Sequence, residues 1–86
     1  MIRTVMGILI DNRKNNATTV QKILTDWGCF IKVRLGLHDG VLNTCSESGL
    51  LILELVGEVE KHEELKRKLN LLDGVKAETM KLDLEL

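Results

Sequence analysis

The chain has 86 residues, with 12 Lys and Arg against 13 Asp and Glu and a formal net charge of −1. A chain of this length buries only about 60–65% of the surface that its unfolded form exposes, which leaves no room for a second core. Leu, Ile and Val total 29 residues, which excludes a disordered chain, whereas one Phe, one Trp and no Tyr exclude an aromatic platform for single-stranded nucleic acid. The near-neutral charge also argues against attraction to a phosphate backbone, so no direct nucleic-acid binding is expected.

Cysteine content and the lack of a targeting segment predict a cytoplasmic protein. Cys29 and Cys45 are too few for the disulfide framework that a small secreted domain usually carries. The apolar run over residues 1–10 is short for a signal peptide and lacks a small-residue cleavage site. No stretch approaches the roughly 20 apolar residues that span a membrane.

The first third of the chain predicts a strand followed by a helix. Residues 2–11 are rich in β-branched side chains and end at a polar cluster over residues 11–16. Asn15 or Asn16 is placed to cap the following helix with its side-chain oxygen. Apolar residues then recur at helical spacing up to Gly28, a typical helix stop: Val20, Ile23, Leu24 and Trp27.

The rest of the chain predicts two strands, a helix and a last strand. Residues 30–37 alternate, with Ile31, Val33 and Leu35 expected to face the core and Lys32 and Arg34 to face outward. A loop over residues 38–48 leads to a strand over 49–57 and a helix over 58–72, which Asp73-Gly74 ends. Residues 75–82 then form the fourth strand.

This β-α-β-β-α-β order predicts an α+β, ferredoxin-like fold in a single domain over residues 1–86. Two split β-α-β units form a four-stranded antiparallel sheet with both helices on one face. The first and third strands are central in that arrangement. His62 falls on the apolar stripe of the second helix and is expected to be a core histidine.

The central strands are apolar in both phases, although only one face of the sheet is covered by helices. A monomer rarely exposes such a strip, so a homodimer or higher homo-oligomer is expected, with face-to-face sheets or paired sheet edges as alternatives. A cross-strand pair between Arg34 and Glu54 is expected on the same face. The predicted interface comprises Ile8, Ile10, Lys32, Arg34, Leu50, Ile52, Glu54 and Val56.

The polar turn before the first helix is the candidate ligand site. A helix N-terminus favours an anion or a ligand carboxylate because its first amides are free. The alternative is a solvated turn with a helix cap. The candidate residues are Asp11, Asn12, Arg13, Asn15 and Asn16.

No metal, cofactor or catalytic site is expected. His38 and Cys45 in the long loop are weak metal candidates, because their spacing matches no zinc pattern. No Ser/His/Asp set, Cys-x-x-Cys or paired carboxylate is found in a recognisable arrangement, so the chain is not expected to be an enzyme.

Several segments resemble the small regulators of the iron-only hydrogenase system, over nearly the whole chain. They are Val5–Arg13, Val20–Gly28, Val33–Leu37 and Leu65–Lys76. Those proteins are related to ACT domains and to the C-terminal domain of the nickel-responsive repressor. The resemblance therefore implies an ACT-like, cytoplasmic regulatory module that oligomerises and senses a small molecule.

The resemblance also implies what this chain lacks. The nickel repressor binds metal through His residues on the second strand and a Cys before the third, where this chain has Lys32, Arg34 and Gly49. ACT domains bind amino acids near the first strand-to-helix loop, which is the polar turn here. The leading hypothesis is a homo-oligomeric regulator or small-ligand sensor without catalysis; the alternatives are a protein-interaction scaffold without a ligand and, third, a metal-responsive regulator.

Overall fold

The computed structural model describes residues 1–11, 14–37 and 48–85. Its elements follow the expected order: β1 (Ile2–Asp11), α1 (Ala17–Asp26), the 3-10 helix η2 (Gly28–Phe30), β2 (Ile31–Leu37), β3 (Ser48–Leu55), α2 (Val59–Asn70) and β4 (Val75–Asp83). Neither α1 nor α2, the helices of the described ranges, is long and apolar enough to cross a membrane.

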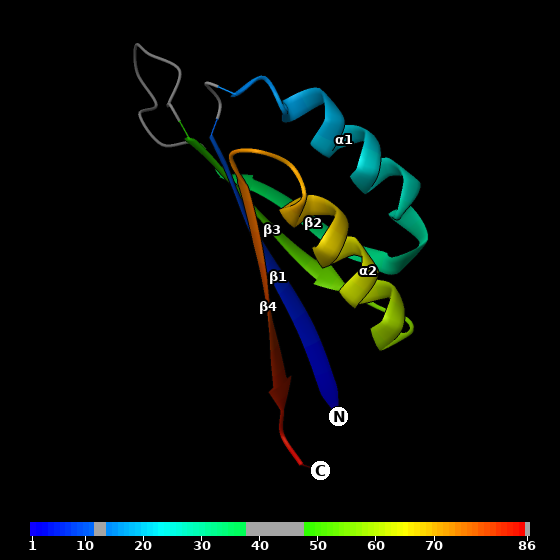
Figure 1. Cartoon of the computed structure of the whole chain (residues 1–86). Helices are drawn as coiled ribbons and strands as arrows, with labels where there is room; N and C mark the ends of the chain where they lie inside the picture. Colours follow the sequence, from blue (N-terminus) through cyan, green and yellow to red (C-terminus); the bar gives the residue numbers. More distant parts are fainter. Residues whose placement is uncertain (12–13, 38–47, 86) are drawn as a thin grey trace.

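The four strands form one antiparallel sheet in the order β2-β3-β1-β4, and α1 and α2 lie side by side on one of its faces (Figure 1). The ferredoxin-like α+β fold predicted from the sequence is confirmed. β1 and β3 are the central strands because each β-α-β unit is split by insertion of a strand between its two ends. The opposite face of the sheet carries neither helix.

The hydrophobic core lies between the helices and the sheet. Alternate residues of β1 point into it, including Met6, Ile8 and Ile10, and they meet Leu53 of β3 and Leu65 of α2. Ile8 is fully buried and Ile10 is 5% exposed, so the prediction that both lie on an uncovered surface is wrong. Since strand side chains alternate, the residues of β1 that face away from the helices are Val5, Gly7 and Leu9.

Ile31 packs against the core as predicted, but from Val33 onward β2 presents the opposite side chains from those predicted. Val33 and Leu35 lie opposite Glu54 and Ile52 on the uncovered side, whereas Arg34 is paired with buried Leu53. A β-bulge between Ile31 and Val33 causes the reversal, because one extra residue shifts the alternation by one position. Lys32 lies within this bulge. The regular alternation seen in the sequence therefore gave the wrong phase for the part of β2 after the bulge.

Two contacts hold the helices in place. The Trp27 ring, at the end of α1, donates its indole N–H to the Lys61 carbonyl of α2 at 3.2 Å, and the Lys68 ammonium lies 5.3 Å from the centre of that ring. Asn70, the last residue of α2, donates to the Ala77 carbonyl at 3.0 Å and accepts from the Ala77 amide at 2.8 Å. This pair occupies the outer edge of β4 and so covers backbone groups that a sheet edge leaves open.

The turn between α2 and β4 packs against the turn before α1. Asn16 is the N-cap of α1, but its side chain makes no cap bond; it donates instead to the Asp73 carbonyl. Gly74 has a φ of +76°, and a Cβ on it would lie 2.7 Å from Cγ of Lys14 and 3.2 Å from Cβ of Asp11. The absence of a side chain at this position is therefore required for both the backbone conformation and the close approach.

We expect Gly74→Ala to lower the free energy of unfolding by about 1–3 kcal/mol, because alanine is strained at positive φ and its methyl group collides with Lys14. Urea denaturation measures the loss. Gly28→Ala is the matched control, since a Cβ there meets nothing within 4 Å and its φ is not in the left-handed region. Equal stability of the two variants would contradict the packing of the two turns.

Candidate functional site

The uncovered side of the sheet is apolar, and we refer to it as the open face. Its most exposed apolar side chains leave about half of their surface accessible, between 49% and 55%. They come from β1, β2 and β4, and β3 adds two half-buried residues. The apolar members are Val5, Leu9, Val33, Leu35, Leu50, Ile52, Met80 and Leu82.

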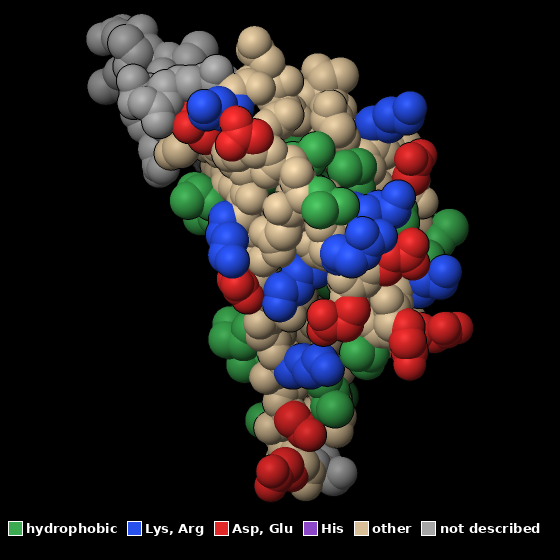
Figure 2. Space-filling view, in the orientation of Figure 1, with side chains coloured by type: hydrophobic (Ala, Val, Ile, Leu, Met, Phe, Trp, Pro, Cys, Tyr) green, Lys and Arg blue, Asp and Glu red, His purple; other side chains and the backbone are tan. Residues whose placement is uncertain are grey.

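The helical side of the molecule has a different character. Lys and Arg side chains are interspersed with Asp and Glu over α2 in Figure 2, as expected of a surface in water. Exposed apolar residues also occur elsewhere, such as Ile2, Val59 and Leu71, but the strand register gathers those of the open face into one surface.

Charged side chains that border the open face neutralise one another. Arg3 of β1 holds Glu54 of β3 through two hydrogen bonds of 2.6 Å, Nε to Oε2 and Nη2 to Oε1. This pair lowers the pKa of the Glu54 carboxyl, first through the hydrogen bond from Arg3. At the β4 edge, Lys76 lies 3.1 Å from Glu78 and lowers its pKa, again first through a hydrogen bond, and Lys66 lies 3.4 Å from the same carboxylate.

Gly7 lies in the middle of the open face, between Ile52 of β3 and Glu78 of β4. A Cβ at this position would meet nothing within 4 Å, so the fold of the chain itself does not require a glycine there. Glycine weakens the interior of a strand and often marks a place where another backbone approaches closely. Because Gly7 has no side chain and a Cβ there would meet open space, we refer to this position as the hollow at Gly7.

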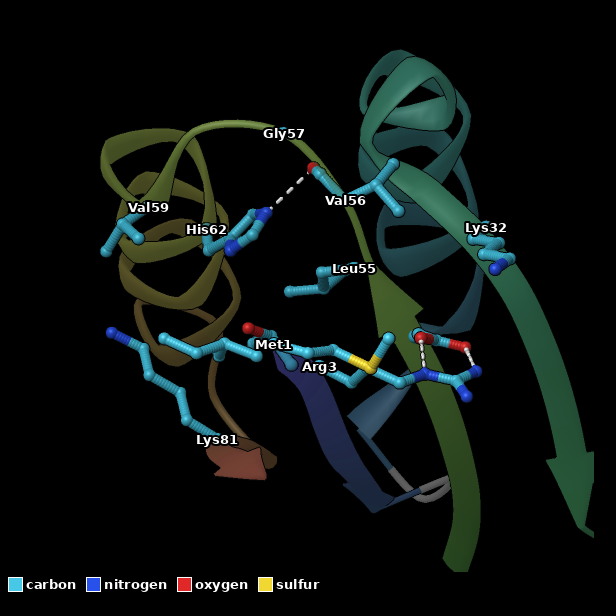
Figure 3. Close-up of a pocket in the computed structure, with 12 residues that line it drawn as sticks. Met1, Arg3, Lys32, Leu55, Val56, Gly57, Val59, His62 and Lys81 are labelled. Atoms are coloured by element: carbon cyan, nitrogen blue, oxygen red, sulfur yellow. Dashed lines mark hydrogen bonds and ion pairs between the residues drawn. The ribbon is translucent and has the colours of Figure 1, made fainter. Parts of the chain in front are cut away.

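A pocket of about 500 Å³ lies at the end of the sheet where β1 begins and β3 ends, and we refer to it as the basal pocket (Figure 3). The first turn of α2 forms one wall, and strand residues form the others. Its polar lining comes from Arg3, Thr4, Lys32, Glu54, His62 and Lys81, and its other lining residues include Leu55, Val56, Gly57 and Val59. Arg3 and Glu54 belong both to this lining and to the border of the open face.

The predicted interface residues are distributed over three places. Leu50, Ile52 and Glu54 lie on the open face, as expected. Lys32 and Val56 line the basal pocket, Val56 after the end of β3. Arg34, which is exposed, lies on the helix side of the register, and the partner of Glu54 is Arg3, so the expected pair between Arg34 and Glu54 is wrong.

The predicted ligand turn lies at the other end of the sheet from the basal pocket. The Asp11 amide donates to the Gly74 carbonyl at 2.7 Å, and Asn16 binds the Asp73 carbonyl. Asn15 adopts a left-handed conformation with a φ of 56°. Asn12 and Arg13 lie outside the described residues. The side chain of Asn16 is thus used to join two turns.

The weak metal candidates, His38 and Cys45, also lie outside the described residues. Within residues 1–11, 14–37 and 48–85, no three His, Cys, Asp or Glu side chains lie close enough to hold a metal ion. Cys29 is exposed and not packed in the core. Sequence reasoning overlooked Arg3, Thr4 and Lys81, because their importance depends on which strand residues share one end of the sheet.

Comparison with known proteins identifies the fold and nothing narrower. No family model and no curated protein matches the chain. Among solved structures, uncharacterized protein TM1266 from Thermotoga maritima is similar over 96% of this chain and 100% of its own, with a TM-score of 0.82 and 19% identity. The de novo designed protein Foldit4 has a TM-score of 0.54 and 12% identity over 95% of this chain and 96% of its own.

A larger protein contains a similar unit. A formyltetrahydrofolate deformylase from Pseudomonas putida matches 91% of this chain with a TM-score of 0.55 and 12% identity, and the match covers 28% of that protein. Sequence identities this low establish a shared ferredoxin-like architecture alone.

We expect the pair between Arg3 and Glu54 to make stability depend on pH in acid. The folded-state pKa of Glu54 is lowered, so its contribution is complete above the unfolded value of about 4.5 and is lost as the pH falls through the lowered folded value. The urea midpoint of the wild type should fall more between pH 6 and pH 3 than that of Glu54→Gln. Parallel pH curves for the two proteins would contradict this expectation.

Proposed function

We propose that this chain is a non-catalytic regulatory module that assembles with a second copy of itself through the open face. The observation that carries the proposal is the row of half-exposed aliphatic side chains across the uncovered side of the sheet. A contiguous apolar surface of this kind marks an interaction site in soluble proteins.

The size of the open face supports a stable pair of chains. Its five most exposed aliphatic residues each leave on the order of 100 Å² accessible, with half-buried neighbours adding to the total. One partner of a standard interface buries about 800 Å², of which a little over half is apolar. The exposed aliphatic area is therefore sufficient for the apolar part of such an interface.

Charge neutrality supports a second copy as the partner. A two-fold interface places the same surface on both sides, so any net charge would face its own copy. Because Arg3 is paired with Glu54 and Lys76 with Glu78, each copy brings charges that are already neutralised. The hollow at Gly7 then lets the two sheets approach closely at the centre.

The regulatory part of the proposal is supported by the resemblance to small regulators of the iron-only hydrogenase system. The test is which genes lie beside this one and whether the genome encodes an iron-only hydrogenase. A position beside hydrogenase-maturation genes supports it, whereas presence of the gene in a genome without any iron-only hydrogenase overturns the link to that system.

We expect Leu9→Glu to convert the assembly to a monomer. Leu9 is central in the open face and about half exposed, so the new carboxylate remains in water in the monomer, where Lys76 lies directly opposite on β4. In the assembly the same carboxylate would be buried against apolar side chains. Sedimentation equilibrium at micromolar concentration measures the change in mass.

The matched control is Leu71→Glu, since Leu71 is 71% exposed and follows α2, away from the open face. It should keep the wild-type mass. A wild-type protein that sediments as a monomer overturns the proposal, as does an assembly that Leu9→Glu leaves intact.

We expect Gly7→Val to separate folding from assembly. A β-branched residue in a strand should raise the stability of the monomer by about 0.5–1 kcal/mol, because none of the described residues beyond its chain neighbours lies within 4 Å of its Cβ. The same side chain should fill the hollow and weaken self-association at least about tenfold. Urea denaturation in the monomeric Leu9→Glu background and sedimentation of the single variant measure the two effects; unchanged association contradicts close approach at Gly7.

A further inference from the structure

The basal pocket contains the two polar side chains that are buried within the described part of the chain. Thr4 is 6% exposed and His62 is 4% exposed, in a core that is otherwise aliphatic. They come from β1 and α2, and both line the same pocket. Burying a polar group is costly unless it is hydrogen-bonded, so two such groups at one place require an explanation.

His62 has one ring nitrogen satisfied and one that is not. Nε2 lies 2.7 Å from the Val56 carbonyl (Figure 3), and since a carbonyl can only accept, Nε2 carries the hydrogen of this bond. Nδ1 is buried and has no hydrogen-bond partner among the described residues. In the neutral ring this nitrogen is an acceptor, and it needs a donor that this part of the chain does not supply.

The first turn of α2 brings a free backbone donor to the same wall, the amide of Val59. Glu58 is the N-cap, but its side chain makes no cap bond. Its carbonyl accepts from the amides of Lys61 and His62, and no acceptor within the described ranges reaches the amides of Val59 and Glu60. Unsatisfied amides and the helix dipole favour an oxyanion at this position.

Lys81 supplies a positive charge on the same side. It is paired with Thr4 in the sheet register, which places both residues on the helix-covered face, and its side chain extends along the α2 side of the pocket (Figure 3). No acidic side chain of the described residues lies within ion-pair distance of its ammonium group. Glu54, the acid that lines the pocket, is held by Arg3, whereas Glu58 and Glu60 of α2 are exposed and do not line it.

We propose that the basal pocket binds a small oxyanion that also carries a hydroxyl group, such as a 2-hydroxy carboxylate or hydrogen phosphate. The oxyanion accepts from the Val59 amide, the Thr4 hydroxyl and the Lys81 ammonium, while the ligand hydroxyl donates to Nδ1 of His62. This site is separate from the turn at residues 11–16, at the other end of the sheet, and does not depend on self-association through the open face.

The test is a titration with lactate and, separately, with propionate, monitored by ¹H–¹⁵N NMR. These two acids differ only by the hydroxyl group. Lactate should give saturable shifts of the Val59 amide and of the His62 Nδ1 nitrogen, and should bind several-fold more tightly than propionate because only lactate satisfies Nδ1. The Ala17 and Thr18 amides, at the start of α1, are the internal control and should not move. Inorganic phosphate is titrated in a parallel arm at matched ionic strength.

Variants assign the shifts to the pocket. Lys81→Gln should weaken lactate binding about tenfold through loss of a charge-assisted bond, whereas Lys76→Gln, on the same strand but the other face, should leave it unchanged. His62→Leu should remove the preference for lactate over propionate. The Leu9→Glu variant should bind lactate as the wild type does. Ligand binding can therefore be measured independently of self-association.

The proposal is overturned if neither lactate nor phosphate gives saturable shifts, if the amides of α1 shift in parallel with those of α2, or if Lys81→Gln binds as tightly as Lys76→Gln. Equal binding of lactate and propionate overturns the role of His62. Binding of phosphate without lactate assigns the pocket to phosphate chemistry, and binding of lactate without phosphate assigns it to hydroxy acids.

Discussion

The sheet has two faces, and helices cover one of them. Burial of Met6, Ile8 and Leu53 beneath α1 and α2 accounts for one set of alternate positions in the central strands. The other set is also apolar, so the chain carries hydrophobic surface that its own helices cannot cover. Aliphatic side chains on both faces of the same strands are what a sheet needs if it is to be a middle layer and not an outer one.

The two ends of the sheet differ in chemistry. At one end, the turns around Asn16 and Gly74 are joined by hydrogen bonds and close packing, which uses polar groups to fix the structure. At the other end, Thr4 of β1 and His62 of α2 are buried beside the start of α2, where the Val59 and Glu60 amides have no acceptor among the described residues. Arg3 and Glu54 line this pocket and also border the open face, so this ion pair lies between the two surfaces.

Features that depend on residues close together in the sequence were predictable, whereas features that depend on contacts between distant segments were not. The helices were predictable because their apolar residues repeat at helical spacing, and the order of elements leaves few arrangements. For β1, both phases are apolar, so the sequence offered no means to decide that Ile8 and Ile10 face the core. For β2, the alternation was clear but the bulge at Lys32 reversed it, and a bulge leaves little trace in a single sequence. His62 was predicted to be a core residue, yet its unpaired nitrogen depends on neighbours from other elements.

The amino-acid sequence by itself determined the β-α-β-β-α-β order, the amphipathic helices and the excess of aliphatic residues over what one thin core can hold. Periodicity and composition can be read directly from the amino-acid sequence, without knowledge of the fold. Only the tertiary structure decided which side chains of β1 and β2 face the helices, that Glu54 pairs with Arg3, and that Thr4, His62 and Lys81 meet at one pocket. Those outcomes depend on strand register, in which a shift of one residue moves every side chain to the other face.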